Sequence, residues 1–328
     1  MRIGLLTSGG DAPGMNAAIR AVVRTGTAQG HEMFGIYRGY NGLIEGDIRP
    51  LDNRAVSGII ERGGTILRSA RSQAFLTDEG QEQAVRSIAD HCLDAVIVAG
   101  GNGSLRGARC LHERGIRTIG IPASIDNDVS HTAMAIGVDT ALNTVVDSLN
   151  RIRDTAVSHE RAFVIEVMGR SSGYIALMGG LAGGAELVLM PEKPESLVEI
   201  VREVKTGIET GKRHSILCVA EGFQPTEGVP KGVSAGKAIA AHLEADAGIE
   251  TRLTVLGHLQ RGGSPSAFDR ILACRLGHAA VTWCGEGRTG EMAGLVGQEI
   301  VQIPFERLED PCMNVDRAIH GLAQAVAN

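Results

Sequence analysis

The sequence predicts an α/β protein whose mostly parallel sheets carry helices on both faces. Short apolar runs alternate with amphipathic segments along most of the 328 residues, which is typical of repeated strand–helix units. Several runs end in glycine-rich turns, and the 44 glycines suit the tight connections that such units need. With 43% apolar residues, the chain can bury a sizeable core, in one large unit or in two lobes.

Each expected element comes from its own pattern of apolar residues. The expected strands are the short apolar runs Ile3–Thr7, Met33–Tyr37, Ala95–Ala99, Thr118–Ile121, Ala162–Val167, Leu187–Met190, Ser215–Ala220 and Arg252–Leu256. The expected helices are the amphipathic segments Met15–Gln29, Ser104–Arg114, Asp139–Ala156, Gly173–Ala182, Ser196–Gly211, Ser234–Ala245 and Ser266–Cys284. Because strands and helices alternate, the strands are expected to run parallel.

The composition argues against several classes of protein. A net charge of −6 and an aromatic content of 3% argue against a nucleic-acid binder, which needs basic surface and rings that stack on bases. No apolar run has the length of a membrane span, and the start of the chain does not resemble a signal peptide. The six cysteines are scattered with no CxxC pair, so we expect reduced packing residues. We therefore expect a cytoplasmic protein with no membrane or nucleic-acid partner.

Two glycine-rich turns and a pair of aspartates carry the chemistry. Gly10 lies in the turn after the first strand, and Gly100–Ser104 forms the turn after the third, where a phosphate can approach the next helix. Asp126 and Asp128 follow the fourth strand, where one could accept the proton of a hydroxyl and the other could hold Mg²⁺. Since these strand ends share one edge of a parallel sheet, they indicate phosphoryl transfer from a polyphosphate to a hydroxyl. Turns without chemistry are the alternative.

Several further polar residues stand at strand ends or tight turns. The arginines among them are Arg71, Arg161, Arg170, Arg252 and Arg261. An arginine guanidinium can donate two parallel hydrogen bonds to phosphate oxygens and can stabilise a transferring phosphoryl group. Most arginines, however, form surface ion pairs. His258 lies between glycines near Arg261, which favours a ligand contact over a packed histidine. Glu221 ends a strand and could accept sugar hydroxyls or be simply solvated.

Longer blocks of the sequence resemble one enzyme family. Along residues 3 to about 275 they are LLTSGGDAPGMNAAIR, ERGGTILRSAR, GGNGS, PASIDND, SHERAFVIEVMGR, AGGAE, and ETRLTVLGHLQRGGSP with FDR. They match in order the blocks of the 6-phosphofructokinases of the phosphofructokinase A type. The resemblance implies two similar Rossmann-like lobes with the active site in the cleft between them. Residues 1–137 plus about 260–308 would form a nucleotide-binding lobe, and residues 138–259 plus about 309–328 a sugar-phosphate-binding lobe.

The resemblance also assigns roles to individual positions. Asp126 would be the base for the sugar 1-hydroxyl, Asp128 and Asn102 would serve Mg²⁺, and Ser124 and Arg170 would lie at the transferring phosphoryl group. The residues for fructose 6-phosphate would be Ser124, Asp126, Met168, Gly169, Arg170, Glu221, His258 and Arg261, with Arg161 and Arg252 from a neighbouring subunit. The residues for ATP would be Gly10, Tyr40, Arg71, Gly101, Asn102, Gly103 and Ser104. A homo-oligomer, expected to be a tetramer, would thus be part of the site.

The phosphoryl donor depends on a few positions. Pyrophosphate users of the family typically carry Asp where this chain has Gly103 and Lys where it has Ala123, so the smaller residues leave room for ATP. The blocks VAEGFQP and AFDR look more like the bacterial branch that contains pyrophosphate enzymes, which keeps that donor as an alternative.

Two positions depart from the pattern of the family. Asn102 replaces a Mg²⁺-binding aspartate, and Leu76 replaces a basic residue. A sugar-phosphate-binding regulatory paralogue with little catalysis is therefore a second alternative, and a kinase for another sugar phosphate is a third.

The resemblance further implies an effector site for ADP or phosphoenolpyruvate. Its pattern is matched by Arg20, Arg24, Arg153, Glu186 and Lys212, while Asn53 stands where an arginine is expected. The alternative for Arg20 and Arg24 is a solvated basic helix face, since four residues separate them.

Overall fold

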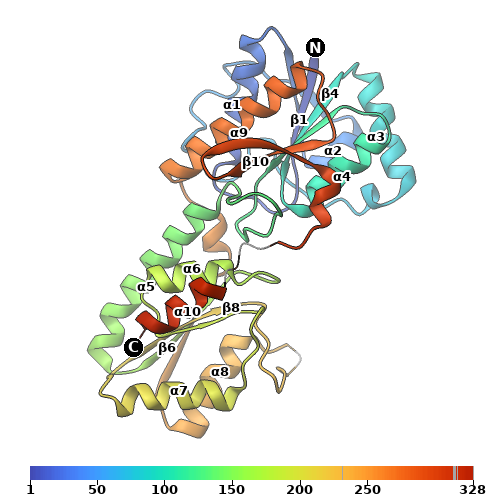
Figure 1. The fold of residues 1–328 in the computed structure, drawn as a ribbon. Helices are drawn as coiled ribbons and strands as arrows, with labels where there is room; N and C mark the ends of the chain where they lie inside the picture. Colours follow the sequence, from blue (N-terminus) through green and yellow to red (C-terminus); the bar gives the residue numbers. More distant parts are fainter. Residues whose placement is uncertain (231, 313–314, 316, 328) are drawn as a thin grey trace. The chain divides into compact units, whose positions relative to one another are not determined.

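The computed structural model describes residues 1–230, 232–312, 315 and 317–327, so residues 231, 313, 314, 316 and 328 of the second predicted lobe lie outside the described residues. The chain divides into two compact units (Figure 1). The first comprises Met1–Thr140 and Arg261–Cys312, and the second comprises Ala141–Gln260 and Met313–Asn328. Each unit has a mostly parallel sheet and packed helices, which confirms the predicted α/β class.

A seven-stranded sheet lies at the centre of the first unit. Its strands are β1 (Arg2–Thr7), β2 (Glu32–Ile36), β3 (Ile48–Pro50), β4 (Ala95–Gly100), β5 (Thr118–Pro122), β10 (Glu291–Val296) and β11 (Glu299–Pro304). The order is β11-β10-β5-β4-β1-β2-β3, with the edge strands β3 and β11 antiparallel to their neighbours. The apolar run AVIVAG of β4 is fully buried because helices cover both faces. The winding direction reverses between β1 and β4, and open α/β sheets bind ligands at such points.

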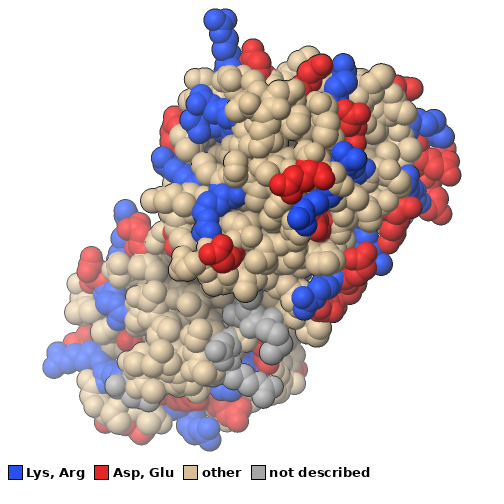
Figure 2. Space-filling view, turned by 45° about the horizontal axis from the view of Figure 1, so that its top comes forward, with Lys and Arg blue, Asp and Glu red and all other residues tan. Residues whose placement is uncertain are grey.

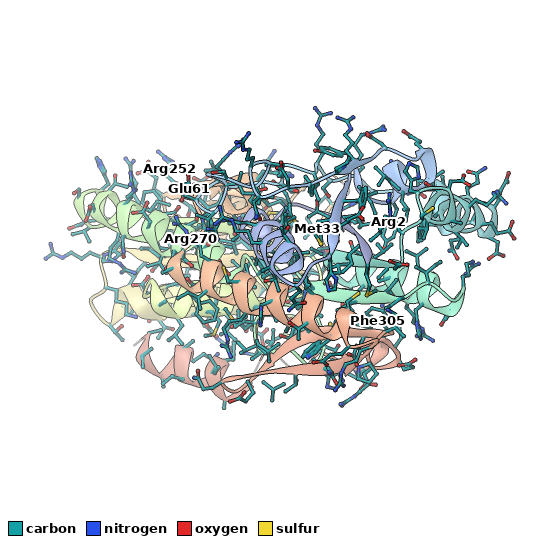
Figure 3. The ribbon with its side chains drawn as sticks, turned by 90° about the horizontal axis from the view of Figure 1, so that it is seen from above. Arg2, Met33, Glu61, Arg252, Arg270 and Phe305 are labelled. Carbon is teal, nitrogen blue, oxygen red and sulfur yellow. The ribbon has the colours of Figure 1, made fainter. Side chains whose placement is uncertain are left out.

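Helices and short turns cover both faces of this sheet. They are α1 (Met15–Ala28), α2 (Gly39–Glu45), η1 (Ala74–Leu76), α3 (Asp78–Asp90), α4 (Asn102–Glu113), α9 (Ala267–Gly285) and η3 (Phe305–Glu309). α1 packs against α9, whereas α2, α3 and α4 form a core cluster with Leu6, Val96 and Val98 of the sheet. Phe305, labelled in Figure 3, and Leu308 belong to this cluster, so η3 is anchored in the core of the unit.

The second unit has a four-stranded parallel sheet. Its strands are β6 (Ala162–Val167), β7 (Leu187–Leu189), β8 (Ser215–Ala220) and β9 (Thr251–Val255), in the order β7-β8-β6-β9. The remaining elements are α5 (Val138–His159), α6 (Tyr174–Ala182), α7 (Leu197–Glu209), α8 (Ala235–Ala247), η2 (Gly257–Arg261) and α10 (Arg317–Val326). α7 and α8 share a core with the sheet through residues such as Ile200, Leu243 and Val219, while α10 contacts α6.

All predicted strands and helices are present, with ends that differ by three residues or fewer. The prediction missed β3, β10, β11, α2, α3 and α10. β10 and β11 form a hairpin in which Val296 pairs with Glu299, so Gly297, at φ 59°, opens a two-residue turn. α3 was missed because its sequence, DEGQEQAVRSIAD, is mostly polar. The sheets of seven and four strands also make the units less alike than the predicted similar lobes.

The cysteines correct one expectation. All six are free thiols, and Cys218 and Cys284 are buried as predicted for packing residues. Burial raises the pKa of the Cys218 thiol to about 12, which keeps it uncharged. Cys92 and Cys312 are exposed, so they are not core residues.

In the described ranges, no helix combines the length and the apolar character needed to cross a bilayer.

Charged side chains of both signs intermingle over the face shown in Figure 2. Ion pairs between exposed or half-buried side chains occur in both units, such as Arg38 Nη2 with Asp47 Oδ2 at 3.5 Å in the first and Arg151 Nε with Asp147 Oδ2 at 2.8 Å in the second. Exposed pairs of this kind contribute about 0–1 kcal/mol of stability, so the buried polar contacts described below matter more to the fold.

Candidate active site

A pocket of about 530 Å³ in the first unit lies at the carboxyl ends of β1, β4 and β5. Among its lining residues are predicted site residues from six separate segments of the chain. They are Gly10, Tyr40, Arg71, Gly101, Asn102, Gly103, Ser104, Ser124, Asp126, Asp128 and Arg261. The topology explains this gathering, because β1, β4 and β5 are neighbouring parallel strands and the turns that follow them meet at one edge.

The start of α4 offers a surface for an anion. Gly101 precedes the helix without a side-chain cap, and the first turn of the helix has no acidic residue. Backbone N–H groups at a helix start bind anions, and the helix dipole favours negative charge there. A Cβ on Gly103 would have no other atom within 4 Å, so this position borders open space. The sequence GGNGS thus leaves the start of α4 open, and phosphate binding there stays a prediction.

Gly10 and Arg261 lie against each other in the pocket. A Cβ on Gly10 would lie 2.7 Å from Nη1 of Arg261, so a side chain at this position would displace the guanidinium. Arg261 Nη1 also donates a hydrogen bond to the carbonyl oxygen of Asp11 at 3.1 Å. The resemblance implies that Gly10 binds the nucleotide and Arg261 the sugar phosphate, and the structure shows that the two residues adjoin.

Tyr40 is one of the residues that line the pocket. Its side chain is 4% exposed, its hydroxyl donates to the Ser104 carbonyl oxygen at 2.6 Å, and its ring stacks on Phe75 with centroids 4.0 Å apart. Burial raises the pKa of Tyr40 well above its ordinary value, so the hydroxyl stays protonated and continues to donate. Tyr40 therefore connects α2 to the first turn of α4.

Asp126 and Asp128 follow β5 in a tight turn centred on Asn127. Asn127 is fully buried with φ 46°, a left-handed conformation that Asn tolerates better than most residues. Its side-chain oxygen accepts a hydrogen bond from the Ala135 N–H at 3.0 Å, which fixes the turn. The Ser124 hydroxyl donates to Asp128 Oδ1 and accepts from the Asp126 N–H, both at 3.3 Å. The two half-buried carboxylates are thus oriented by the turn itself.

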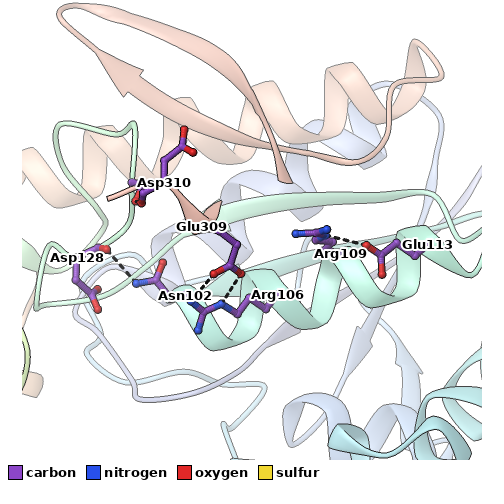
Figure 4. Close-up of polar contacts among 8 residues, drawn as sticks. Asn102, Arg106, Arg109, Glu113, Asp128, Glu309 and Asp310 are labelled. Atoms are coloured by element: carbon purple, nitrogen blue, oxygen red, sulfur yellow. Dashed lines mark hydrogen bonds and ion pairs between the residues drawn. The ribbon is translucent and has the colours of Figure 1, made fainter. Parts of the chain in front are cut away.

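Asn102 and Asp128 provide oxygen atoms suited to Mg²⁺. The Asn102 amide donates through Nδ2 to the Asp128 carbonyl oxygen at 2.9 Å (Figure 4). Asn102 Oδ1 is buried, and the described residues give it no hydrogen-bond partner, which is a costly state for an amide oxygen. A cation would satisfy this atom, so the residues fit Mg²⁺, which takes oxygen ligands and keeps several waters. The described residues contain no cluster of three His, Cys, Asp or Glu side chains suited to a metal, so phosphates and water would complete the shell.

The pocket also contains Arg106, which the sequence analysis missed. Arg106 lies four residues after Asn102 on α4, and this helical spacing could have predicted that both face the same side. Its Nε and Nη2 atoms donate to the two carboxylate oxygens of Glu309 at 2.9 and 3.1 Å (Figure 4). Leu76, noted above as a departure from the family pattern, is 74% exposed and presents an apolar side chain to the same pocket.

The predicted acceptor residues of the second unit follow three neighbouring strands. Met168, Gly169 and Arg170 follow β6, Glu221 follows β8, and His258 lies in η2 after β9. β6 runs parallel to β8 and β9 and lies between them, so these residues gather at one edge of the sheet. A Cβ on Gly169, where φ is 135°, would lie 2.4 Å from a carbonyl oxygen, so the turn requires glycine. Arg170, Glu221 and His258 are exposed, as contacts to a ligand must be.

Arg161 and Arg252 lie at the opposite edge of that sheet. Arg161 precedes β6, and Arg252 is the second residue of β9. Both bind Glu250, through Arg161 Nε at 2.7 Å and Arg252 Nη2 at 2.5 Å. The length of β6 separates the two edges by about 20 Å, which is beyond the reach of an arginine side chain. Within one chain these arginines therefore cannot join the acceptor residues, and their contribution from a neighbouring subunit stays a prediction.

The predicted effector residues are only partly brought together. Arg153 Nη1 lies 3.6 Å from Glu186 Oε1. Glu186 and Lys212 line a second pocket, of about 740 Å³, in the second unit. Arg20 and Arg24 belong to α1 of the first unit.

Comparison with known proteins identifies the family. The family model for phosphofructokinase matches residues 2–284. The chain belongs to the phosphofructokinase family. Two curated relatives named ATP-dependent 6-phosphofructokinase, from Brevibacillus brevis and Bacillus pumilus, are 47% and 49% identical over 326 residues, with 99% of each chain covered. The sequence blocks quoted above therefore predicted the family correctly.

Solved phosphofructokinase structures share the fold. The phosphofructokinase of Saccharomyces cerevisiae is 34% identical with a TM-score of 0.87, covering 99% of this chain and 48% of the yeast chain, so this chain spans about half of that protein. A pyrophosphate-dependent phosphofructokinase from Marinobacter aquaeolei is 22% identical with a TM-score of 0.86, covering 100% and 92% of the two chains. Because an enzyme named for pyrophosphate shares the fold of a chain whose curated relatives are named for ATP, the donor has to be inferred from residues in the pocket.

Proposed function

We propose that this phosphofructokinase transfers the γ-phosphoryl group of ATP to the 1-hydroxyl of fructose 6-phosphate, a step of glycolysis that gives fructose 1,6-bisphosphate and ADP. The observation that carries the proposal is the pocket of the first unit, which combines an open helix start with Asp126 and Asp128. The names of the relatives at 47% and 49% identity support both the donor and the acceptor.

Asp126 is the proposed general base. Its carboxylate accepts the proton of the 1-hydroxyl while the hydroxyl oxygen attacks the γ-phosphorus, the bond to the bridging oxygen breaks, and ADP leaves. The N–H groups at the start of α4, together with Arg71, bind the donor phosphates. Ser124 lies at the transferring phosphoryl group, where Arg170 stabilises its charge.

The sugar phosphate is proposed to bind the predicted acceptor residues together with two arginines of a neighbouring subunit. The acceptor set comprises Met168, Gly169, Arg170, Glu221, His258 and Arg261, with Arg161 and Arg252 of the neighbouring subunit. This arrangement requires a homo-oligomer, which we propose is a tetramer in the cytoplasm. Arg20, Arg24, Arg153, Glu186 and Lys212 are proposed to bind ADP or phosphoenolpyruvate as effector.

Asp128 and Asn102 would hold Mg²⁺ beside the donor phosphates. When bound, Mg²⁺ supplies positive charge to the β- and γ-phosphate oxygens. Asn102→Asp should lower the Mg²⁺ concentration needed for half-maximal turnover by about tenfold, because a second carboxylate strengthens binding of a hard cation. Titration of activity with Mg²⁺ at fixed ATP measures this shift, and Asn102→Ala, which removes the oxygen, should move the requirement in the opposite direction. An unchanged Mg²⁺ requirement in both variants would exclude Asn102 as a ligand.

Gly103 should control access of the nucleotide. Gly103→Asp should lower kcat/KM for ATP by more than about 100-fold, because its carboxylate would occupy open space beside the donor phosphates and repel them. An acidic residue in the first turn of α4 suits the helix dipole, so the melting temperature should not fall. The control Gly103→Asn has nearly the same volume without the charge and should lose less. If Gly103→Asp kept wild-type kcat/KM for ATP, the donor would not bind at this helix start.

The proposed donor is tested directly with the purified chain. Product formation from fructose 6-phosphate and Mg²⁺ is measured in parallel with ATP and with pyrophosphate. We expect turnover with ATP and none with pyrophosphate. Turnover with pyrophosphate alone would show that other residues outweigh Gly103 and Ala123, and sugar-phosphate binding without turnover would favour a regulatory paralogue.

A further inference from the structure

A short segment near the C-terminus contacts the turn that carries the two aspartates. We call residues 309–312 the strap and residues 124–133 the catalytic turn. The strap begins at the end of η3, and Phe305 and Leu308 of η3 are buried, with exposures of 0% and 4%. The strap is thus anchored in the core of the first unit. The strap contributes none of the described residues that line the pocket.

Two polar contacts join the strap to the catalytic turn. His131 Nε2 lies 2.6 Å from Asp310 Oδ2, and the Ser130 hydroxyl donates to the Asp310 carbonyl oxygen at 2.6 Å. The hydrogen bond from His131 lowers the pKa of Asp310, and Arg307 Nε lies 3.4 Å from the same carboxylate oxygen. These residues are about 180 positions apart in the sequence, so their contact fixes the turn to a distant part of the chain.

A third contact involves backbone oxygens of the turn. Cys312 Sγ lies 3.7 Å from the Asn127 carbonyl oxygen and 3.9 Å from that of Val129, both of which belong to fully buried residues. Asn127 and His131 have positive φ angles of 46° and 64°. Such conformations cost free energy in residues other than glycine and persist only where surrounding contacts impose them. The strap contacts both residues, Asn127 through Cys312 and His131 through Asp310.

The strap also reaches the other side of the proposed Mg²⁺ site. Glu309 accepts two hydrogen bonds from Arg106 of α4, one turn after Asn102, and Asn102 donates to the Asp128 carbonyl oxygen (Figure 4). The strap therefore holds both the helix that carries Asn102 and the turn that carries Asp128.

We infer that His131 and Asp310 are positioning residues for the phosphoryl transfer, acting through the catalytic turn to hold Asp126 and Asp128 in place. The inference rests on the proposed function of those two aspartates. A displacement of about 1 Å in a reacting group can cost about 100-fold in rate, so loss of the pair should affect turnover although neither residue touches the substrate.

The test compares His131→Ala and Asp310→Asn with the wild-type enzyme. We expect kcat to fall by about tenfold or more and the Mg²⁺ requirement to rise, while KM for fructose 6-phosphate changes by less than about twofold. His131→Gln retains an N–H donor for Asp310 and should recover most of kcat. The matched control is Glu113→Gln, which removes the exposed pair with Arg109, at 2.8 Å on α4, and should leave all three parameters unchanged (Figure 4).

Hydrogen exchange separates this inference from the proposed function. Amides of residues 124–133 should exchange faster in His131→Ala than in the wild type, with the rest of the first unit unchanged. An inactive wild-type enzyme would refute the proposed function, whereas an active His131→Ala with wild-type kcat, Mg²⁺ requirement and exchange would overturn the inference. If His131→Ala does not fold, Asp310→Asn, which keeps an acceptor of the same size, decides by the same measurements.

Discussion

Asp126→Ala is expected to lower kcat by about 10³–10⁴-fold, which is the contribution of a positioned general base together with the orientation of its hydroxyl substrate. KM for fructose 6-phosphate should change by less than about threefold, because most acceptor residues follow strands other than β5. A coupled assay of product formation measures kcat, and calorimetric titration measures binding of the sugar phosphate.

Two further variants isolate the role of the Asp126 carboxylate. Asp126→Asn keeps the shape of the side chain and removes the base, so it should be nearly as slow as Asp126→Ala. Asp90→Asn, at an exposed position at the end of α3, serves as a control and should retain wild-type kcat. An Asp126→Ala variant with kcat near the wild-type value would show that another group accepts the proton.

Asp269→Ala is expected to lower the free energy of unfolding by about 3–5 kcal/mol, because three buried donors lose their acceptor and each unsatisfied buried group costs roughly 1–3 kcal/mol. Asp269 is fully buried and accepts hydrogen bonds from the Gly137 N–H at 2.9 Å, the Thr140 N–H at 2.8 Å and the Thr140 hydroxyl at 2.5 Å. It thereby satisfies backbone donors at the start of α5. Burial raises the pKa of Asp269, and these hydrogen bonds offset part of that increase.

Urea denaturation measures the effect of Asp269→Ala on stability. Asp147→Ala is the matched control, because it removes a carboxylate from an exposed pair with Arg151 and should change the free energy of unfolding by less than about 0.5 kcal/mol. Equal denaturation midpoints for the two variants would show that the buried hydrogen bonds of Asp269 contribute little to the fold.

Much of the fold was predictable because its central strands are continuous apolar runs. β4 and β6 are buried along their whole length, so strong hydrophobicity marks them in the sequence. The edge strands β3 and β11 are half exposed and carry mixed residues, which hides them. α3 likewise depends on its Thr77 cap and on a few buried residues rather than on an apolar stripe.

The candidate site was predictable where its residues lie at strand ends. The turns after β1, β4 and β5 come together because parallel neighbouring strands place their ends at one edge. Contacts that depend on tertiary packing were not predictable. Nothing in the local sequence links Arg106 to Glu309 or His131 to Asp310, which are 203 and 179 positions apart. The separation of Arg161 and Arg252 from the other acceptor residues likewise follows from strand direction and strand order.

The most direct test of the proposed reaction is the identity of the product formed by the wild-type chain from fructose 6-phosphate and MgATP. Phosphorus NMR of the reaction mixture distinguishes phosphate on the 1-oxygen from phosphate elsewhere on the sugar. We predict a new resonance of a 1-phosphate ester that appears together with ADP in equal amounts. ADP formed without that resonance, or no reaction of a chain that binds fructose 6-phosphate, would contradict the account.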